Sequence, residues 1–180
     1  MKKFLTTLIV SMFCFAFNSA SRAQSTSSQP PASKTIKSAI RFHTLGRYKT
    51  DRWSTIFRDR EVVPALRAVL KKDYGLLRES LGQANYPEDS DSFMDKNGVL
   101  KLEGGVKGLY TIMEAALIIE PGGNIYAAIL DEGKQFLYFT NDQKYLDKLP
   151  PAIEQWRIGV ESRRSQPSEV PKLPVVFKNQ

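Results

Sequence analysis

The sequence predicts an α+β fold, in which an antiparallel meander sheet of about four strands is covered by an amino-terminal helix and a carboxy-terminal helix. Three observations lead to this prediction. Residues 98–140 form short apolar runs separated by turn sequences, which is typical of consecutive strands. Residues 62–81 and residues from 149 onward instead carry apolar side chains at helical spacing.

The four strands are expected at 99–103, 113–120, 125–130 and 135–140. The sequence Pro-Gly-Gly-Asn at 121–124 predicts one tight turn, and Asp-Glu-Gly-Lys at 131–134 predicts the next. Alternation along 113–120 gives one face of the sheet only apolar side chains, whereas Glu114 and Glu120 make the other face mixed. The apolar face is therefore the one that needs a cover.

The first helix is expected to supply that cover. Its stripe is spaced four, four, three and four residues apart, as one helix face requires, and consists of Leu66, Leu70, Tyr74, Leu77 and Leu81. Gly75 lies inside this stretch, so a kink or a break near Asp73 is an open alternative to one long helix.

The second helix is expected to begin at Pro150-Pro151 and to run to about Ser162. Its stripe is Leu149, Ile153, Trp156 and Val160, and we expect it to pack beside the first helix or across the sheet edge. The prolines at 167, 171 and 174 then favour an extended tail.

The ends of the chain suggest four segments. Residues 1–23 have a basic head, an apolar run of fourteen residues and Ser21-Arg22-Ala23, which predicts a secretory signal peptide cleaved after Ala23. Residues 24–33 are expected to be a disordered linker, 34–162 a single α+β domain and 163–180 a proline-rich basic tail. The only cysteine, Cys14, leaves with the signal. The mature protein is therefore expected in the periplasm or outside the cell, without thiols or disulfides.

Charge is distributed unevenly along the chain. The formal net charge is +7, and loss of Lys2, Lys3 and Arg22 with the signal leaves +4. Residues 34–72 carry eleven basic and three acidic side chains, whereas residues 73–162 carry eight basic and fifteen acidic ones. A basic amino-terminal region thus precedes an acidic sheet region, and the two are suited to different partners.

Candidate catalytic and metal-ligating residues are few. His43 is the only histidine, and the sequence contains no nucleophile elbow, no paired histidines and no phosphate-binding loop. Glu103, Glu114 and Glu120 lie on or beside expected strands and leave carboxylate-based hydrolysis open as an alternative. We expect a protein that is not an enzyme and that needs no cofactor and no metal.

The link between the first two strands is the candidate partner-binding loop. Its three glycines predict a bent or mobile connection that presents side chains without core periodicity. The residues of this candidate loop are Gly104, Gly105, Val106, Lys107, Gly108 and Tyr110.

The export signal, a helix ahead of a strand, a glycine-rich link and an antiparallel meander resemble the periplasmic inhibitors of vertebrate-type lysozyme, most clearly over 98–140. In that family the corresponding link carries a Cys-Lys-Pro-His-x-Cys loop whose histidine enters the lysozyme cleft. Here only Lys107 matches that motif, and both cysteines and the histidine are missing. The resemblance implies a binding protein that blocks an enzyme by an altered mechanism.

Two functions follow as hypotheses. The first is an exported inhibitor or immunity-type protein whose partner is a lysozyme-like or amidase-like enzyme that degrades the cell wall. The second is a non-inhibitory envelope or extracellular module that holds an anionic lipid or polymer. Its contacts would come from a region where aromatic and basic residues alternate, although those aromatics can also cover the sheet while the cations stay in water. The basic residues are Arg41, Arg47, Lys49 and Arg52. Nucleic acid is not an expected partner of an exported protein.

Overall fold

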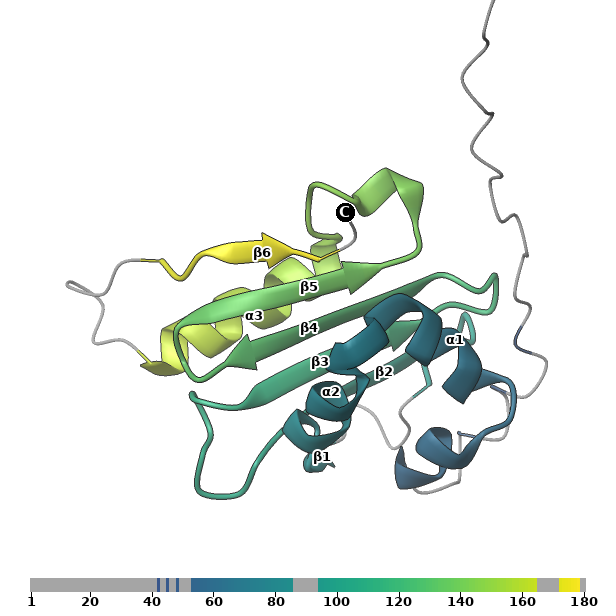
Figure 1. The fold of residues 1–180 in the computed structure, drawn as a ribbon, viewed down its shortest axis with the longest axis horizontal. Coiled ribbons are helices and arrows are strands. Elements are labelled where there is room, and N and C mark those ends of the chain that lie inside the picture. Colours follow the sequence, from purple (N-terminus) through teal and green to yellow (C-terminus); the bar gives the residue numbers. More distant parts are fainter. Residues whose placement is uncertain are drawn as a thin grey trace, which may run out of the picture. The chain divides into compact units, whose positions relative to one another are not determined.

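The computed structural model describes Phe42, Leu45, Tyr48 and residues 53–85, 94–164 and 172–178. The predicted signal peptide, the linker, His43 and the basic residues Arg41, Arg47, Lys49 and Arg52 lie outside this part of the chain. In the described part, helices lie on both faces of one sheet (Figure 1).

The sheet has six strands in the order β1-β2-β3-β4-β5-β6. Each strand pairs antiparallel with the next, except that β5 and β6 run parallel. The predicted α+β class is confirmed, but the sheet is mixed and is not a purely antiparallel meander. The strands are β1 (Gln83–Asn85), β2 (Leu100–Gly105), β3 (Glu114–Ile119), β4 (Ile125–Asp131), β5 (Gln135–Thr140) and β6 (Val175–Phe177).

Both predicted turns of the meander are present. At the β3–β4 turn, Gly123 has a φ of 94°, and its amide donates to the carbonyl oxygen of Glu120 at 2.9 Å. At the β4–β5 turn, Glu132 and Gly133 both have positive φ, as in the turns that match the twist of a hairpin. These turns set the register that aligns Ala116 with Ala128 and Ala128 with Tyr138.

One face of the sheet is covered by the segment before β1. This segment contains the 3-10 helix η2 (Trp53–Arg58), α1 (Val62–Leu70), the 3-10 helix η3 (Lys71–Asp73) and α2 (Tyr74–Ser80). Leu66, Leu70 and Leu77 are fully buried and pack with Leu117 and Ile129 of the sheet. The apolar stripe predicted for the first helix therefore covers the apolar face of the sheet, as expected from the sequence (Figure 1).

The stripe is divided between two helices because α1 ends at Leu70. Lys71 follows with φ 53° and ψ −120°, a conformation that favours glycine over residues with a side chain. The sequence left open a break in the first helix near Asp73, and the break is found two residues earlier, at Lys71. Gly75 lies within α2, and a Cβ at this position would have open space around it.

Replacing Lys71 with glycine is expected to raise the free energy of unfolding by about 1 kcal/mol. The strain removed from a disfavoured backbone conformation exceeds the entropy that glycine adds to the unfolded chain. Urea unfolding measures the change, and Lys72→Gly is the matched control, since Lys72 is not among the residues with positive φ and should lose stability. Equal destabilisation by both substitutions would contradict the strain at Lys71.

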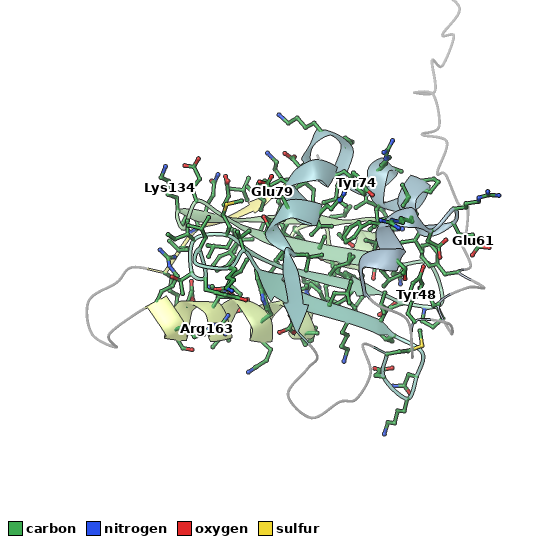
Figure 2. All side chains as sticks on the ribbon, turned by 90° about the horizontal axis from the view of Figure 1, so that it is seen from below. Tyr48, Glu61, Tyr74, Glu79, Lys134 and Arg163 are labelled. Carbon is green, nitrogen blue, oxygen red and sulfur yellow. The ribbon has the colours of Figure 1, made fainter. Side chains whose placement is uncertain are left out.

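The opposite face of the sheet is covered by α3 (Pro151–Arg164). Ile153, Trp156 and Val160 are buried there, and the Trp156 ring meets Phe136 edge-on with centroids 5.6 Å apart. In Figure 2 the sheet is seen edge-on between α3 and the preceding helices. The expectation that this helix packs beside the first helix or across the sheet edge is wrong. The helix covers the second face of the sheet, which the sequence analysis interpreted as mixed and which is also buried.

The extended tail returns to the sheet as β6. Its residues pair in parallel with β5, and the chain before it is held by α3, where the Glu161 carboxylate accepts the Leu173 amide at 3.1 Å. Arg157, itself buried, donates to both Glu161 and Glu154. Val175–Phe177 therefore lies against β5 at the edge of the sheet (Figure 1).

Candidate functional site

The candidate loop is the tip of the β2–β3 hairpin. The two strands pair up to Gly105 and Glu114, and the Val106 amide adds one further hydrogen bond to the Met113 carbonyl at 3.1 Å. The chain between them turns twice, because the Leu109 amide donates to Val106 and the Met113 amide donates back to Leu109. We define the hairpin tip as residues 106–113.

Gly104 and Gly105, two of the predicted loop residues, belong to β2 and are buried. A Cβ at Gly105 would lie 2.8 Å from the Tyr110 ring and 3.1 Å from Cγ of Glu114. The glycine therefore lets the tyrosine ring lie directly on the strand. Gly108 remains within the tip and has a φ of 83°, which suits glycine.

The hairpin tip gathers large apolar side chains at the surface. Leu109 is 39% exposed, Tyr110 42% and Ile112 43%, and the fourth large exposed hydrophobic residue of the described chain, Ile158, lies on α3. Exposed apolar side chains that cluster on one loop are typical of a contact surface. Lys107 lies beside them, exposed, and no carboxylate of the described residues forms an ion pair with it.

The base of the tip is fixed by a buried carboxylate. Glu114 is 4% exposed, and one of its oxygens accepts the Thr111 amide at 2.6 Å. The other oxygen accepts from the Arg163 guanidinium at 2.5 Å, which joins the hairpin to the last turn of α3. A buried carboxylate is stable only with such partners. Glu114 is therefore a structural anchor of the tip.

A second set of contacts joins the tip to the β4–β5 turn. The Gly133 amide donates to the Ile112 carbonyl at 2.8 Å, and the Arg164 guanidinium donates to the Gly133 carbonyl. Figure 2 shows Arg163 on α3 and Lys134 on this turn at the same end of the sheet. The exposed side chains of the tip are thus carried by a backbone that is tied to two other elements. Such support keeps a recognition loop in one conformation before it binds.

Of the three glutamates considered for carboxylate chemistry, Glu103 and Glu114 are diagonal neighbours on the paired strands β2 and β3, and Glu120 lies apart from them. Glu114 and Glu120 lie at opposite ends of β3, which separates them by about 20 Å. Glu120 accepts from the Asn124 side chain at 2.8 Å, and Glu103 is exposed in β2 opposite Ala116. None of the three lines the pocket between η3 and the β5–β6 edge or the narrow void between α3 and the sheet.

Asp95 and its neighbours form a local turn. The Asp95 carboxylate accepts the amides of Asn97 at 2.8 Å and Val99 at 3.0 Å, and Lys101 lies 3.6 Å away. Burial opposes ionisation of Asp95, but these amides and Lys101 together hold the pKa of its carboxyl below the usual value. Across residues 53–85, 94–164 and 172–178, no three His, Cys, Asp or Glu side chains are arranged to hold a metal ion.

The contacts predicted for an anionic surface, Arg41, Arg47, Lys49 and Arg52, lie outside the described residues, so that role stays a prediction.

In the described chain no helix is both long and apolar enough to cross a membrane. Comparison with protein-family models, with curated proteins and with solved structures gave no match.

Proposed function

We propose that this chain is an exported binding protein that inhibits a cell-wall-degrading enzyme, and that the hairpin tip is its contact surface. The observation that carries the proposal is the clustering of Leu109, Tyr110 and Ile112 at the surface of a tip whose backbone is held by α3 and by the β4–β5 turn. Aromatic and aliphatic anchors on a rigid loop are what a protein interface uses for most of its affinity.

The charge pattern supports this class of partner. Residues 73–162 carry seven more acidic than basic side chains, which would steer the protein toward a basic enzyme. Lys107 is exposed at the tip and has no ion-pair partner among the described residues, and in this proposal it would meet the carboxylates of a glycoside-cleaving site. In this proposal the apolar side chains provide affinity and Lys107 provides specificity.

The experiment is an inhibition assay with the purified mature protein. Lysis of cell-wall suspensions by a panel of muramidases and amidases is followed by turbidity, and inhibition of at least one enzyme is expected. Absence of inhibition across the panel, together with absence of binding in a pull-down, would contradict the proposal.

Tyr110→Ala and Lys107→Ala are each expected to weaken inhibition at least fivefold, which corresponds to about 1 kcal/mol of binding free energy. Lys107 is exposed, whereas the Tyr110 ring also lies on Gly105, so amide hydrogen exchange of residues 106–113 is measured beside the assay and should be unchanged in both variants. Lys96→Ala is the matched control, because Lys96 is an exposed lysine outside the tip. Inhibition by the tip variants equal to that of the control would remove the tip from the interface.

A further inference from the structure

A second candidate contact surface lies at the edge of the sheet that β6 forms (Figure 1). β6 is the last strand in the sheet order, and all three of its residues are half-buried, whereas every residue of the central strand β3 is buried. Because β5 and β4 lie between β6 and β3, three strand spacings, about 14 Å, separate this edge from the strand that carries the hairpin tip.

The pairing of β6 with β5 shows which backbone groups of β6 remain open. The Lys178 amide donates to the Tyr138 carbonyl at 2.9 Å, and the Pro174 carbonyl accepts an amide of β5 at the same distance. In a parallel register alternate residues of a strand turn their N–H and C=O groups toward the neighbour. The backbone groups of Val175 and Phe177 therefore point away from β5, and no strand of the described structure pairs with them on that side.

Open backbone groups at a sheet edge are a template for a further strand. An extended segment that lies antiparallel to β6 would exchange two hydrogen bonds with Val175 and two with Phe177. These bonds form with any sequence, so selection of a partner has to come from the side chains on the two faces of β6.

The face of β6 toward the first helices is basic. Val176 packs against the core cluster on this side, and Lys178 lines the pocket of about 460 Å³ between η3 and the β5–β6 edge. The other charged residues of the pocket are Lys71, Lys72 and Asp73, so three lysines stand against one aspartate. We call Lys71, Lys72 and Lys178 the edge lysines. In the part of the chain that the structure describes, no carboxylate forms an ion pair with them.

The edge lysines distinguish a second copy from another partner. If β6 paired antiparallel with β6 of a second copy, the edge lysines of both copies would lie on the same face of the joined sheet. Like charges on neighbouring strands are destabilising, and lysines beside an edge strand are one way in which proteins prevent self-pairing. The same lysines attract a strand that carries carboxylates at alternate positions.

The face of β6 toward α3 is apolar. Val175 and Phe177 pack against the cluster between α3 and the sheet, and the Phe177 ring meets Tyr138 edge-on with centroids 5.6 Å apart. Because both residues of this face are only half-buried, the alternate side chains of an added strand would lie beside them. Apolar side chains suit these alternate positions.

We propose that the β6 edge binds an extended acidic segment of a partner protein by strand addition. The carboxylates of the segment lie toward the edge lysines, and its alternate apolar side chains lie beside Val175 and Phe177. The backbone of β6 provides the docking, and the charge pattern provides the selection. Because no residue of the hairpin tip takes part, this binding is independent of the proposed inhibition.

The test is a titration of the mature protein with a capped eight-residue peptide in which glutamate and valine alternate. Backbone amide NMR is expected to show saturable binding of one peptide, with shifts centred on residues 174–178. The matched peptide with lysine in place of glutamate should bind at least tenfold more weakly. Equal binding of the two peptides, or shifts centred on β1 at the other edge of the sheet, would overturn the proposal.

Two N-methylated forms of the glutamate peptide test strand addition directly. One is methylated at every valine amide and the other at every glutamate amide. Only one of these alternate sets of amides can face β6, so one form should lose binding and the other should keep it. In an antiparallel arrangement the valine-methylated form loses binding, and in a parallel arrangement the glutamate-methylated form does. Equal binding of both forms would show that the peptide does not add as a strand.

Lys178→Glu tests the charge selection. Reversal of this partly exposed charge is expected to weaken binding of the glutamate peptide about fivefold and to strengthen binding of the lysine peptide by a similar factor. Unfolding cannot produce such an exchange of preference. Lys96→Glu, which changes a lysine outside the β6 edge, is the matched control and should leave both affinities unchanged. An unaltered preference in Lys178→Glu would overturn the role of the edge lysines.

Val175→Pro tests the open edge of β6. The substitution removes an N–H that points away from β5, so the pairing with β5 should remain while binding of the glutamate peptide is lost. Val175→Thr keeps the N–H and should bind as the parent does, and thermal unfolding checks that both variants are folded. Undiminished binding by Val175→Pro would contradict the proposal. Concentration-dependent dimerisation that protects residues 174–178 from hydrogen exchange would assign the edge to a second copy and would overturn it as well.

Discussion

Replacing Trp156 with alanine is expected to lower the free energy of unfolding by about 3–5 kcal/mol. The indole is 6% exposed and packs edge-on against Phe136, with Ile153 and Val160 buried beside it in the same cluster. Its removal leaves a cavity between α3 and the sheet. Urea or thermal unfolding of the mature protein measures the loss.

Ile158→Ala is the matched control for this prediction. Ile158 lies on the same helix but is 47% exposed, so its truncation should change stability by no more than about 0.5 kcal/mol. If the two substitutions had equal effects, the second face of the sheet would not be covered by α3. The interpretation of Arg163 as a support for the hairpin tip would then fail as well.

Arg163→Met is expected to lower the free energy of unfolding by about 1–2 kcal/mol, because it leaves the buried Glu114 carboxylate without its cation. The arginine is itself partly exposed, which places the estimate below that for a fully buried pair. Amide hydrogen exchange should accelerate across residues 106–113, since the Glu114 carboxylate also holds the Thr111 amide. The proposed inhibition should weaken in parallel.

Lys134→Met is the control for an ion pair without a structural role. Its partner Glu132 is exposed on the same β4–β5 turn, so no measurable loss of stability is expected. Combining Arg163→Met with Glu114→Gln should recover part of the loss, because no unpaired charge then remains buried. If Arg163→Met behaved like Lys134→Met, the pairing of Glu114 with α3 would not support the tip.

Much of the fold follows from local sequence signals. The four central strands, the turns at 121–124 and 131–134, and the two helical stripes are all found close to their predicted bounds. These features depend on side-chain alternation and on backbone preferences of glycine and proline, which act over a few residues. The exposure of Lys107 and Tyr110 agrees with their lack of core periodicity.

The candidate site was predicted only in part, because its support comes from distant residues. Gly104 and Gly105 suggested a loop, but Gly105 is a strand residue that makes room for Tyr110. Leu109 and Ile112 were not among the predicted contact residues, although they are as exposed as Tyr110. Apolar side chains in a loop give no periodic signal that separates an exposed surface from a buried one.

Local pattern by itself determined the α+β class, the order of the four central strands, and the presence of one helical segment before the meander and one after it in the sequence. Only the tertiary structure decided that α3 covers the second face, that β6 joins β5 in parallel and that the first helix breaks at Lys71. The physical reason is that each of these features depends on a partner far away in sequence. In the sequence, Glu114 makes the second face appear polar, whereas in the structure the guanidinium of Arg163, 49 residues later, pairs with the Glu114 carboxylate. A segment of three residues such as Val175–Phe177 forms a strand only when it pairs with the edge of an existing sheet.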